Sequence, residues 1–408
     1  MTWSFATLSW VGWMLVVLSA WWLRSRPYAI FRGVVIGLHN LMAIAVYSRL
    51  PELPALRYVF VYLHAMVFLQ AVLLIWPRLM PFAYRLLVSL PASWFAASTL
   101  FTFPWAIAFA LGWHLPGVWL PYLVGVFGLV QSLRTRETEV HIRAGRFGAL
   151  AADPGHEEPA LRRIQVENKR LSGRPLRIVQ ITDPHLGPFM SIERLRRIAE
   201  RAVARQPDLV LLTGDFLTME SQGDPSLLGA ALEPLEALSG RVFACRGNHD
   251  LEAPGTVARA LQHAGVELLI DEATLVETDV GPVQILGIDY AFRGRRERMQ
   301  VTCAAHPRIP GALRVVLLHD PGAFVHLPPG EADLVLSGHT HGGQVGLLSL
   351  GLPHTMLALF SRIPDHGLWA RGLDRLYVHR GTGHYGFPLR LGVPSEESVL
   401  CVHPPEVG

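Results

Sequence analysis

One short segment decides the fold prediction: Gly338-His339-Thr340-His341-Gly342-Gly343-Gln344. It follows the run 332–337, which predicts a short buried strand. Two histidines one residue apart at a strand end can face a single point, because the neighbouring glycines let the backbone bend sharply and add no side chain. Histidine is the commonest side-chain metal ligand near neutral pH. The pair indicates either a metal site or a structural loop, and partners elsewhere in the chain decide between them.

Four further apolar runs predict strands that also end in polar loops. The expected strands are 176–181, 208–212, 241–245 and 313–318, and the loops after them carry Asp183 and His185, Asp215, Asn248 and His249, and His319. Helical patterns separate the early strands, whereas the later ones follow each other closely, which favours a layered α/β fold with a mixed sheet. Because ligands on such folds collect at strand carboxyl ends, we expect these loops to form one site.

Together the loops offer more metal ligands than one transition-metal ion takes. The candidate ligands are Asp183, His185, Asp215, Asn248, His319, His339 and His341. Seven oxygen and nitrogen donors suit two divalent ions that share a bridging carboxylate, with Mn, Fe, Zn or Co all acceptable. The three cysteines form no CxxC pair, and their odd number argues against a disulfide framework and favours a reducing compartment.

The series DxH, GD, GNHD, H and GHTHGG resembles the calcineurin-like metallophosphoesterases in order and spacing, over about residues 160–404. The ending GHTHGGQ, with Gly381-Thr382-Gly383 and Pro388-Leu389-Arg390 further on, is similar to a bacterial, membrane-linked branch of that family. Two positions depart from the branch pattern: Pro184 replaces a usual leucine, and Ser395 replaces a second proline. Neither position removes a candidate ligand.

The resemblance implies a four-layer α-β-β-α sandwich and a role for each motif residue. It implies that Asp183, His185 and His341 hold one metal, that Asn248, His319 and His339 hold the second, and that Asp215 bridges them. His249 would protonate the leaving oxygen or stabilise its charge. Metal-activated water would then attack phosphorus without a covalent enzyme intermediate.

Residues 1–133 differ sharply from the rest, with seven arginines, one glutamate and neither lysine nor aspartate. Apolar runs near the ~20 residues needed to span a membrane cover 5–23, 31–48, 57–77, 84–103 and 106–132. We therefore expect a transmembrane region of about five helices over 1–133, a linker and edge strand over 134–173, and the phosphoesterase domain over 174–408. Within the linker, 151–155 is expected to form a loop and 163–167 the edge strand.

Arginine placement suggests the orientation. With five spans, most arginine-containing loops fall on one side, which the positive-inside rule identifies as cytoplasmic together with the catalytic domain; four spans would break this agreement. We expect an integral protein of a bacterial inner membrane that contacts lipids, and no nucleic-acid partner. His39, Asn40, His64 and Gln70 lie within the expected spans. Hydrogen bonding between helices is the preferred interpretation of these residues, and a relay or ligand site is the alternative.

The expected activity is hydrolysis of a phosphomonoester, phosphodiester or pyrophosphate bond, with a lipid-linked substrate such as UDP-diacylglucosamine as one candidate. The alternatives are a phosphodiesterase for a soluble nucleotide, a non-enzymatic membrane sensor that binds a phosphorylated ligand, and a transport role for the N-terminal part. The apolar segment 345–368 follows the metal loop. In one interpretation it borders the site and receives an acyl chain or touches the bilayer. In the preferred interpretation it is ordinary core or an internal cover. His384 is a candidate for substrate contact.

Overall fold

The computed structural model describes residues 2–144, 160–165, 173–384 and 386–403. The chain divides into two compact units, one formed by Met1–Leu133 with Gly386–Leu391 and the other by Arg134–Tyr385 with Gly392–Gly408. The expected loop 151–155 lies outside the described residues, as do 166–167 of the expected edge strand.

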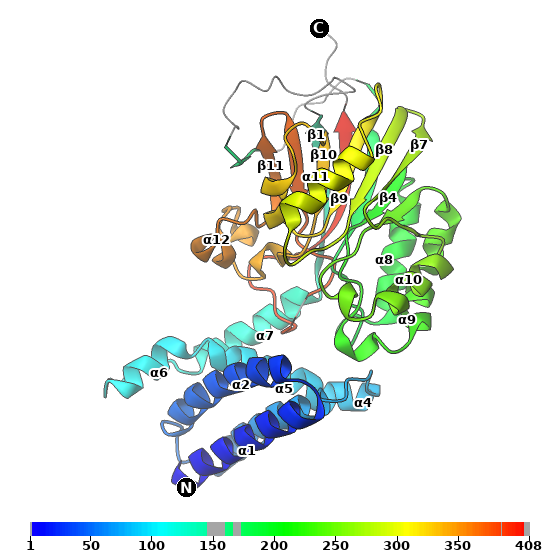
Figure 1. The fold of residues 1–408 in the computed structure, drawn as a ribbon. Coiled ribbons are helices and arrows are strands. Elements are labelled where there is room, and N and C mark those ends of the chain that lie inside the picture. Colours follow the sequence, from blue (N-terminus) through cyan, green and yellow to red (C-terminus); the bar gives the residue numbers. More distant parts are fainter. Residues whose placement is uncertain (1, 145–159, 166–172, 385, 404–408) are drawn as a thin grey trace. The chain divides into compact units, whose positions relative to one another are not determined.

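The first unit is helical (Figure 1). Its helices are α1 (Thr2–Leu23), α2 (Arg26–Tyr47), α3 (Pro54–Leu73), α4 (Phe82–Tyr84), the π-helical turn η1 (Arg85–Ser89), α5 (Leu90–Leu100), α6 (Phe103–Ala110) and α7 (Leu120–Ser132). Within the described residues, α1, α2 and α3 are long and apolar enough to cross a membrane.

The fourth and fifth expected spans are interrupted. The helical segment 82–100 meets α6 at an angle of 53°, and this bent pair counts as one further candidate span. Prolines stand at the starts of α6 and α7. Because a proline lacks the N–H that a helix interior needs but is tolerated in the first turn, new helices begin at Pro104 and Pro121, and two long runs become three shorter helices. The expected number of five spans stays a prediction.

Polar side chains inside the helical unit pair with each other across helices. His39 Nε2 lies 3.1 Å from His64 Nδ1, and His64 Nε2 lies 2.9 Å from the Ser9 hydroxyl. The Asn40 amide donates to the Ser9 carbonyl at 3.0 Å. Gln70 Oε1 accepts from Tyr84 and Ser89. These contacts are the hydrogen bonds between helices that were the preferred interpretation of these residues.

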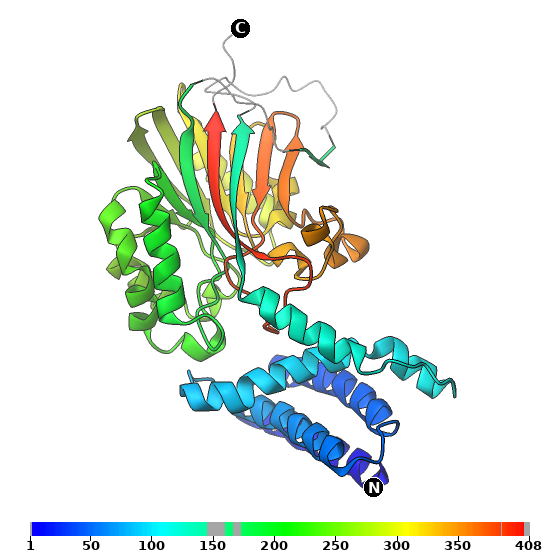
Figure 2. The same cartoon turned by 180° about the vertical axis from the view of Figure 1, so that it is seen from behind.

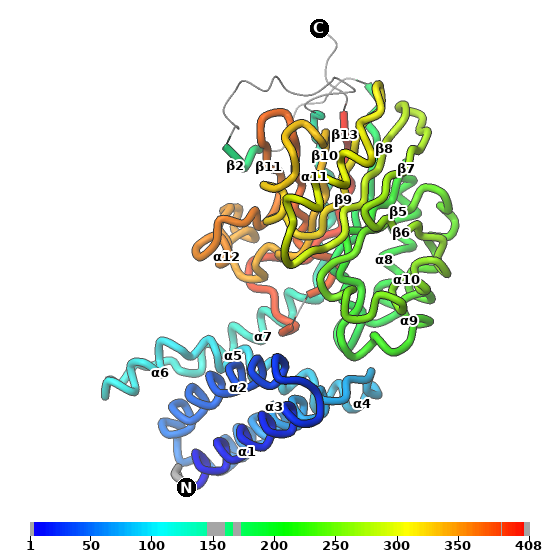
Figure 3. Tube along the Cα trace, in the orientation of Figure 1, coloured from blue at the N-terminus to red at the C-terminus, as the bar shows by residue number. Residues whose placement is uncertain are grey.

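The second unit contains two sheets within its described residues (Figures 2 and 3). The six-stranded sheet has the order β1 (Thr135–Arg143), β13 (Ser395–His403), β3 (Leu176–Ile181), β4 (Leu209–Leu212), β5 (Val242–Ala244) and β6 (Glu267–Leu268). The seven-stranded sheet has the order β2 (Arg162–Arg163), β11 (Gly367–Arg371), β12 (Asp374–Val378), β10 (Leu334–Ser337), β9 (Leu313–Leu318), β8 (Gly281–Ile288) and β7 (Glu272–Thr278).

Alternating side chains of the first sheet face two different cores. Ile178 and Leu211 point into the core between the sheets, where Leu317 of the second sheet meets them. Val179 and Val210 point the other way, against a helical layer. That layer consists of α8 (Ile192–Ala204), α9 (Pro225–Leu232) and α10 (Pro254–His263). The alternation follows from the two-residue period of a strand.

The outer face of the second sheet is also covered. Val316 and Val335 pack there against Met299 of α11 (Arg295–Ala305) and Phe324 of a 3₁₀ turn. Figure 1 shows α11 on one side of the sheets and α8–α10 on the other. The predicted fold class is therefore confirmed: apolar N-terminal helices precede an α/β domain with two sheets between helical layers.

The stretch predicted as a linker contains a long strand. β1 pairs in parallel with β13 over nine residue pairs, from Thr135 with Ser395 to Arg143 with His403. Only Val140 and Ile142 of β1 belong to the inter-sheet core, while most of its other side chains are charged and at least partly exposed. Because its apolar pattern is this short and its partner lies some 260 positions away, the strand is hard to recognise from the sequence.

Candidate two-metal centre

The candidate ligands follow parallel strands of both sheets. β3, β4 and β5 run parallel in one sheet, and β9 and β10 run parallel in the other. Several ligands have left-handed backbone, which is uncommon outside glycine. Positive φ angles occur at Asp183 (51°), His185 (46°), Asp215 (57°), His339 (67°) and His341 (51°). Such conformations cost about 1–3 kcal/mol each and cluster at functional sites, where surrounding contacts hold them.

Asp183, His185 and His341 form the first group. The Nε2 atoms of the two histidines are 3.2 Å apart, and Asp183 Oδ1 lies 3.5 Å from His341 Nε2. All three side chains are buried. One carboxylate and two imidazoles that converge in this way can hold one divalent cation.

Asp215, His319 and His339 form the second group. Asp215 Oδ2 lies 3.2 Å from His319 Nε2, and His319 Nε2 lies 3.2 Å from His339 Nδ1. The same Asp215 oxygen is 3.8 Å from His185 Nε2 in the first group. Asp215 therefore reaches both groups, as a carboxylate that bridges two cations must.

Asn248 is the seventh candidate donor. Its side-chain oxygen Oδ1 is buried and has no hydrogen-bond partner. An unsatisfied buried carbonyl oxygen costs roughly 1–3 kcal/mol, and binding of a metal ion to this oxygen would remove that cost. The neighbouring His249 backbone N–H donates to Asp215 Oδ1 at 2.9 Å, which joins this loop to the bridging residue. The residues of the site fit divalent metals in chemistry and number.

His319 is oriented by a hydrogen bond on its far side. Its Nδ1 donates to the Thr213 carbonyl at 2.6 Å, so Nε2 faces Asp215. Burial lowers the pKa of His319, but the negative charge of Asp215 outweighs this and raises the pKa to about 10. A metal requires neutral imidazole, so metal binding here must release a proton.

His249 lies at the edge of the groups, with its ring centroid 5.6 Å from that of His185. Its Nδ1 is 3.0 Å from Glu252 Oε1. Burial opposes the charge of His249, but the hydrogen bond to Glu252 and the charge of Asp215 outweigh it and raise the pKa of His249. A protonated imidazole beside the candidate ligands can act as a general acid.

Sequence reasoning gave Asp250 no role. Its buried carboxylate accepts hydrogen bonds from the backbone N–H groups of Asp215 (2.7 Å), Phe216 (2.9 Å) and Gly247 (2.7 Å). It therefore fastens the loop that carries Asp215 to the loop that carries Asn248. Its place in the GNHD motif was the available signal.

Two glycines allow ligand loops to approach each other closely. A Cβ at Gly338 would lie 2.1 Å from Asp183 Oδ2, and one at Gly247 would lie 2.2 Å from Asp215 Oδ1. Asp183 in turn accepts the backbone N–H of His339 at 3.0 Å, so these loops fit only without side chains at the glycines.

An exposed apolar segment follows the ligand loop. We call residues 347–363 the apolar arm; it includes α12 (Met356–Phe360), which protrudes from the sheets in Figure 1. Phe360, Leu350 and Leu359 are 81%, 74% and 73% exposed. The preferred prediction of ordinary core is wrong for these side chains. His384 is buried beside Phe189, with ring centroids 5.7 Å apart.

A family model and a number of curated proteins match this chain. The model described as calcineurin-like phosphoesterase matches residues 176–343. Phosphodiesterase YaeI of Escherichia coli is 30% identical over 55% of this chain and 82% of its own length. A Danio rerio transmembrane protein with metallophosphoesterase domain is 30% identical, over 57% and 54%. UDP-2,3-diacylglucosamine pyrophosphatase LpxG of Chlamydia muridarum is 26% identical, over 61% and 92%.

Proposed function

Because this chain belongs to the calcineurin-like metallophosphoesterase family and is a metal-dependent phosphoric ester hydrolase with apolar N-terminal helices, we propose a membrane-bound enzyme that cleaves a phosphomonoester, phosphodiester or pyrophosphate bond with water. The observation that carries the proposal is the meeting of two ligand groups that share Asp215.

Each group would hold one divalent ion. Asp183, His185 and His341 would hold one, Asn248, His319 and His339 would hold the other, and Asp215 would be shared between them. When bound, such ions neutralise phosphate oxygens and activate water as a nucleophile. The donors are all oxygen and nitrogen, which suits Mn, Fe, Zn or Co.

His249 would deliver the proton that the leaving oxygen needs. Glu252 is hydrogen-bonded to Nδ1, which favours a ring that carries a proton on Nδ1 and leaves Nε2–H as the donor to the substrate. The raised pKa of His249 favours the protonated ring that this role needs. His249 is thus the chain's own acid in the reaction.

A lipid-linked substrate is the finer part of the proposal. An open groove of about 440 Å³ is lined by the ligand His339 and by the arm side chains Met356, Phe360 and Ile363. A phosphate at the metals would leave one side of its substrate against this apolar surface, where a hydrocarbon chain gains free energy by leaving water. The relative LpxG bears the name of a pyrophosphatase for an acylated sugar nucleotide.

The catalytic domain is proposed to lie in the cytoplasm of a bacterial cell, with the helices in the inner membrane. The support is the placement of the arginines in loops between the apolar runs. A protease-sensitive tag at the C-terminus of the full chain tests this in spheroplasts. Cleavage before lysis would contradict a cytoplasmic domain.

The activity test uses the detergent-solubilised full chain with Mn²⁺. Substrates are a bis-aryl phosphodiester, an aryl phosphomonoester, UDP-diacylglucosamine and its unacylated counterpart. We expect Asp215→Asn and His249→Gln to lose turnover on every substrate, and His263→Gln, which changes an exposed histidine of α10, to keep it. Equal turnover of the acylated and unacylated sugar nucleotides would leave the two-metal proposal standing and favour a soluble nucleotide substrate.

A further inference from the structure

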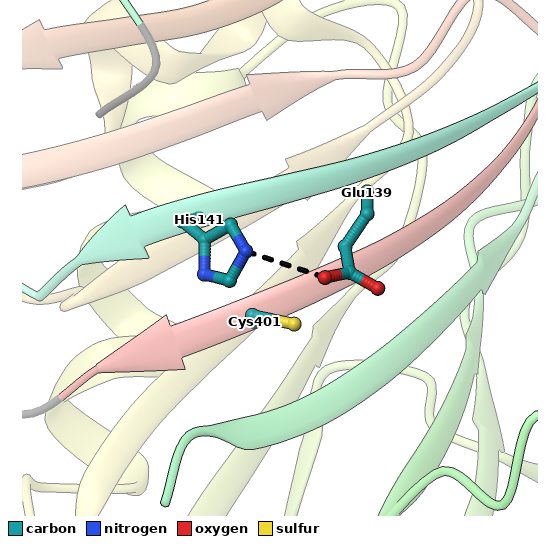
Figure 4. A group of neighbouring side chains, drawn as sticks. All are labelled: Glu139, His141 and Cys401. Atoms are coloured by element: carbon teal, nitrogen blue, oxygen red, sulfur yellow. Dashed lines mark ion pairs between the residues drawn. The ribbon is translucent and has the colours of Figure 1, made fainter. Parts of the chain in front are cut away.

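A second type of side-chain cluster lies on the β1–β13 pair, outside the candidate centre. Figure 4 shows Glu139 and His141 of β1 beside Cys401 of β13. His141 and Cys401 are direct partners in the strand register, and Glu139 precedes His141 by two residues, which puts it on the same face of β1. One ligand atom from each residue lies within 4.8 Å of the others.

The donor set is that of a transition-metal site. A carboxylate oxygen, an imidazole nitrogen and a thiol sulfur are the three side-chain donors that Zn²⁺ accepts, and ligands about 2.0–2.3 Å from zinc lie roughly 3–4 Å apart around a tetrahedron. Glu139 Oε1 and His141 Nε2 are 3.3 Å apart. This separation matches the 3.2 Å between His185 and His341 in the candidate two-metal centre.

His141 is already turned toward the other two donors. Its Nδ1 lies 3.0 Å from His403 Nε2, while its Nε2 faces Glu139. A proton on Nδ1 that is donated to His403 leaves the Nε2 lone pair free for a metal. Metal-binding histidines characteristically use their second nitrogen in this way, because the outer hydrogen bond fixes the tautomer.

Among the described residues, Arg177 brings a positive charge to this cluster. Its guanidinium donates a long hydrogen bond to Cys401 Sγ at 3.8 Å and lies 4.0 Å from Glu139 Oε2, so a metal bound here would have to displace it. About a third of its side chain is exposed, so it can turn toward solvent. A carboxylate and a thiolate together carry enough negative charge to balance Zn²⁺.

We propose that Glu139, His141 and Cys401 bind a zinc ion, separate from the catalytic metals, with a solvent molecule in the fourth position. The ion would link β1 to the C-terminal strand β13. β1 begins directly after α7 in the sequence, so the metal would fasten the first strand after the helices to the sheet that carries Asp183 and Asp215.

Sulfur makes the site distinguishable from the catalytic one, whose candidate ligands contain none. The metal-depleted full chain in detergent is titrated with Co²⁺, and thiolate-to-cobalt charge-transfer absorption is recorded in the near ultraviolet. We expect the band in the wild type, its loss in Cys401→Ser, and its retention in Cys245→Ser and Cys303→Ser, which alter the other buried cysteines. Absence of the band while cobalt is bound, or its persistence in Cys401→Ser, would overturn the proposal.

Cys401 is buried, so its replacement can harm folding, and His141→Gln provides a second test. Its side chain is about one-third exposed, and the substitution removes a ligand without opening the core. We expect His141→Gln to bind one zinc equivalent fewer than wild type, to lose the cobalt band and to retain phosphoesterase turnover. Unchanged zinc content with an unchanged band would refute the site whatever happens to turnover.

Discussion

Five of the seven candidate ligands have strained, left-handed backbone, whereas Phe360 and Leu359 of the neighbouring apolar arm expose 81% and 73% of their surface. In the centre, the lack of a side chain at Gly338 and the hydrogen bonds to Asp250 bring the ligand loops close together. In the arm, large apolar side chains face water. The contrast separates two tasks: reaction chemistry needs preorganised charge, and substrate choice needs a surface that a ligand can cover. Changes in the centre should therefore affect all substrates, and changes in the arm only some.

The largest effect is expected for Gly338→Ala. The new methyl group would lie 2.1 Å from Asp183 Oδ2 and 2.2 Å from Thr182 Oγ1, so Asp183 must move away from its metal position. A displacement of about 1 Å can cost on the order of 10²-fold in rate. The loss is measured as the metal content of the variant and its turnover of the aryl phosphodiester, each compared with wild type.

Gly223→Ala is the control, because a methyl group there meets no atom within 4 Å. Wild-type turnover in Gly338→Ala, with normal metal content, would show that the ligand loops are not as closely fitted as the contrast requires.

Asp250→Asn should come next. An asparagine keeps the shape but replaces one acceptor oxygen by an NH₂ group, which would face at least one of the backbone N–H groups of Asp215, Phe216 and Gly247 and push the loops apart. Residues that orient metal ligands typically matter by about 10–100-fold. Turnover should fall by that amount on all substrates.

Asp224→Asn is the matched control, since Asp224 also accepts a backbone N–H, at the start of α9, where asparagine serves equally well. If Asp250→Asn lost no more activity than Asp224→Asn, the loop-fastening role of Asp250 would be excluded.

The site was more predictable than the molecule around it. A strand followed by Asp, Asn or His can be read locally, and parallel strands bring such ends together, so Asp183, Asp215 and His339 could be placed in one site from sequence. The pairing of β1 with β13 depends on residues far apart. The GNHD motif singles out Asp250 but does not specify which backbone N–H groups its carboxylate accepts. The helices allow several span counts because Pro104 and Pro121 break runs that hydropathy alone joins.

A more selective effect is expected for Phe360→Ala in the arm. If the groove beside His339 receives a hydrocarbon chain, the truncation removes apolar contact worth about 1–2 kcal/mol, or roughly tenfold in KM for an acylated substrate. The unacylated counterpart should be hydrolysed as by wild type.

Leu373→Ala, which changes another exposed apolar side chain of the same domain, is the control. Equal losses on acylated and unacylated substrates would mean that the arm supports the centre instead of selecting the substrate, and would remove the contrast.

The smallest effect is expected for Glu252→Gln, which changes the pKa of His249 and removes no candidate metal ligand. Burial disfavours the charged form of His249, and the Glu252 hydrogen bond and the Asp215 charge raise its pKa. Without the Glu252 carboxylate the pKa of His249 falls, so the general acid loses its proton at lower pH. The alkaline limb of the pH profile of kcat/KM therefore moves to lower pH. The rate at the acidic end stays near that of wild type. Glu272→Gln, an exposed change in β7, should leave the profile in place. A pH profile of Glu252→Gln that coincides with wild type would mean that His249 does not act as the acid, because an acid must follow its own pKa.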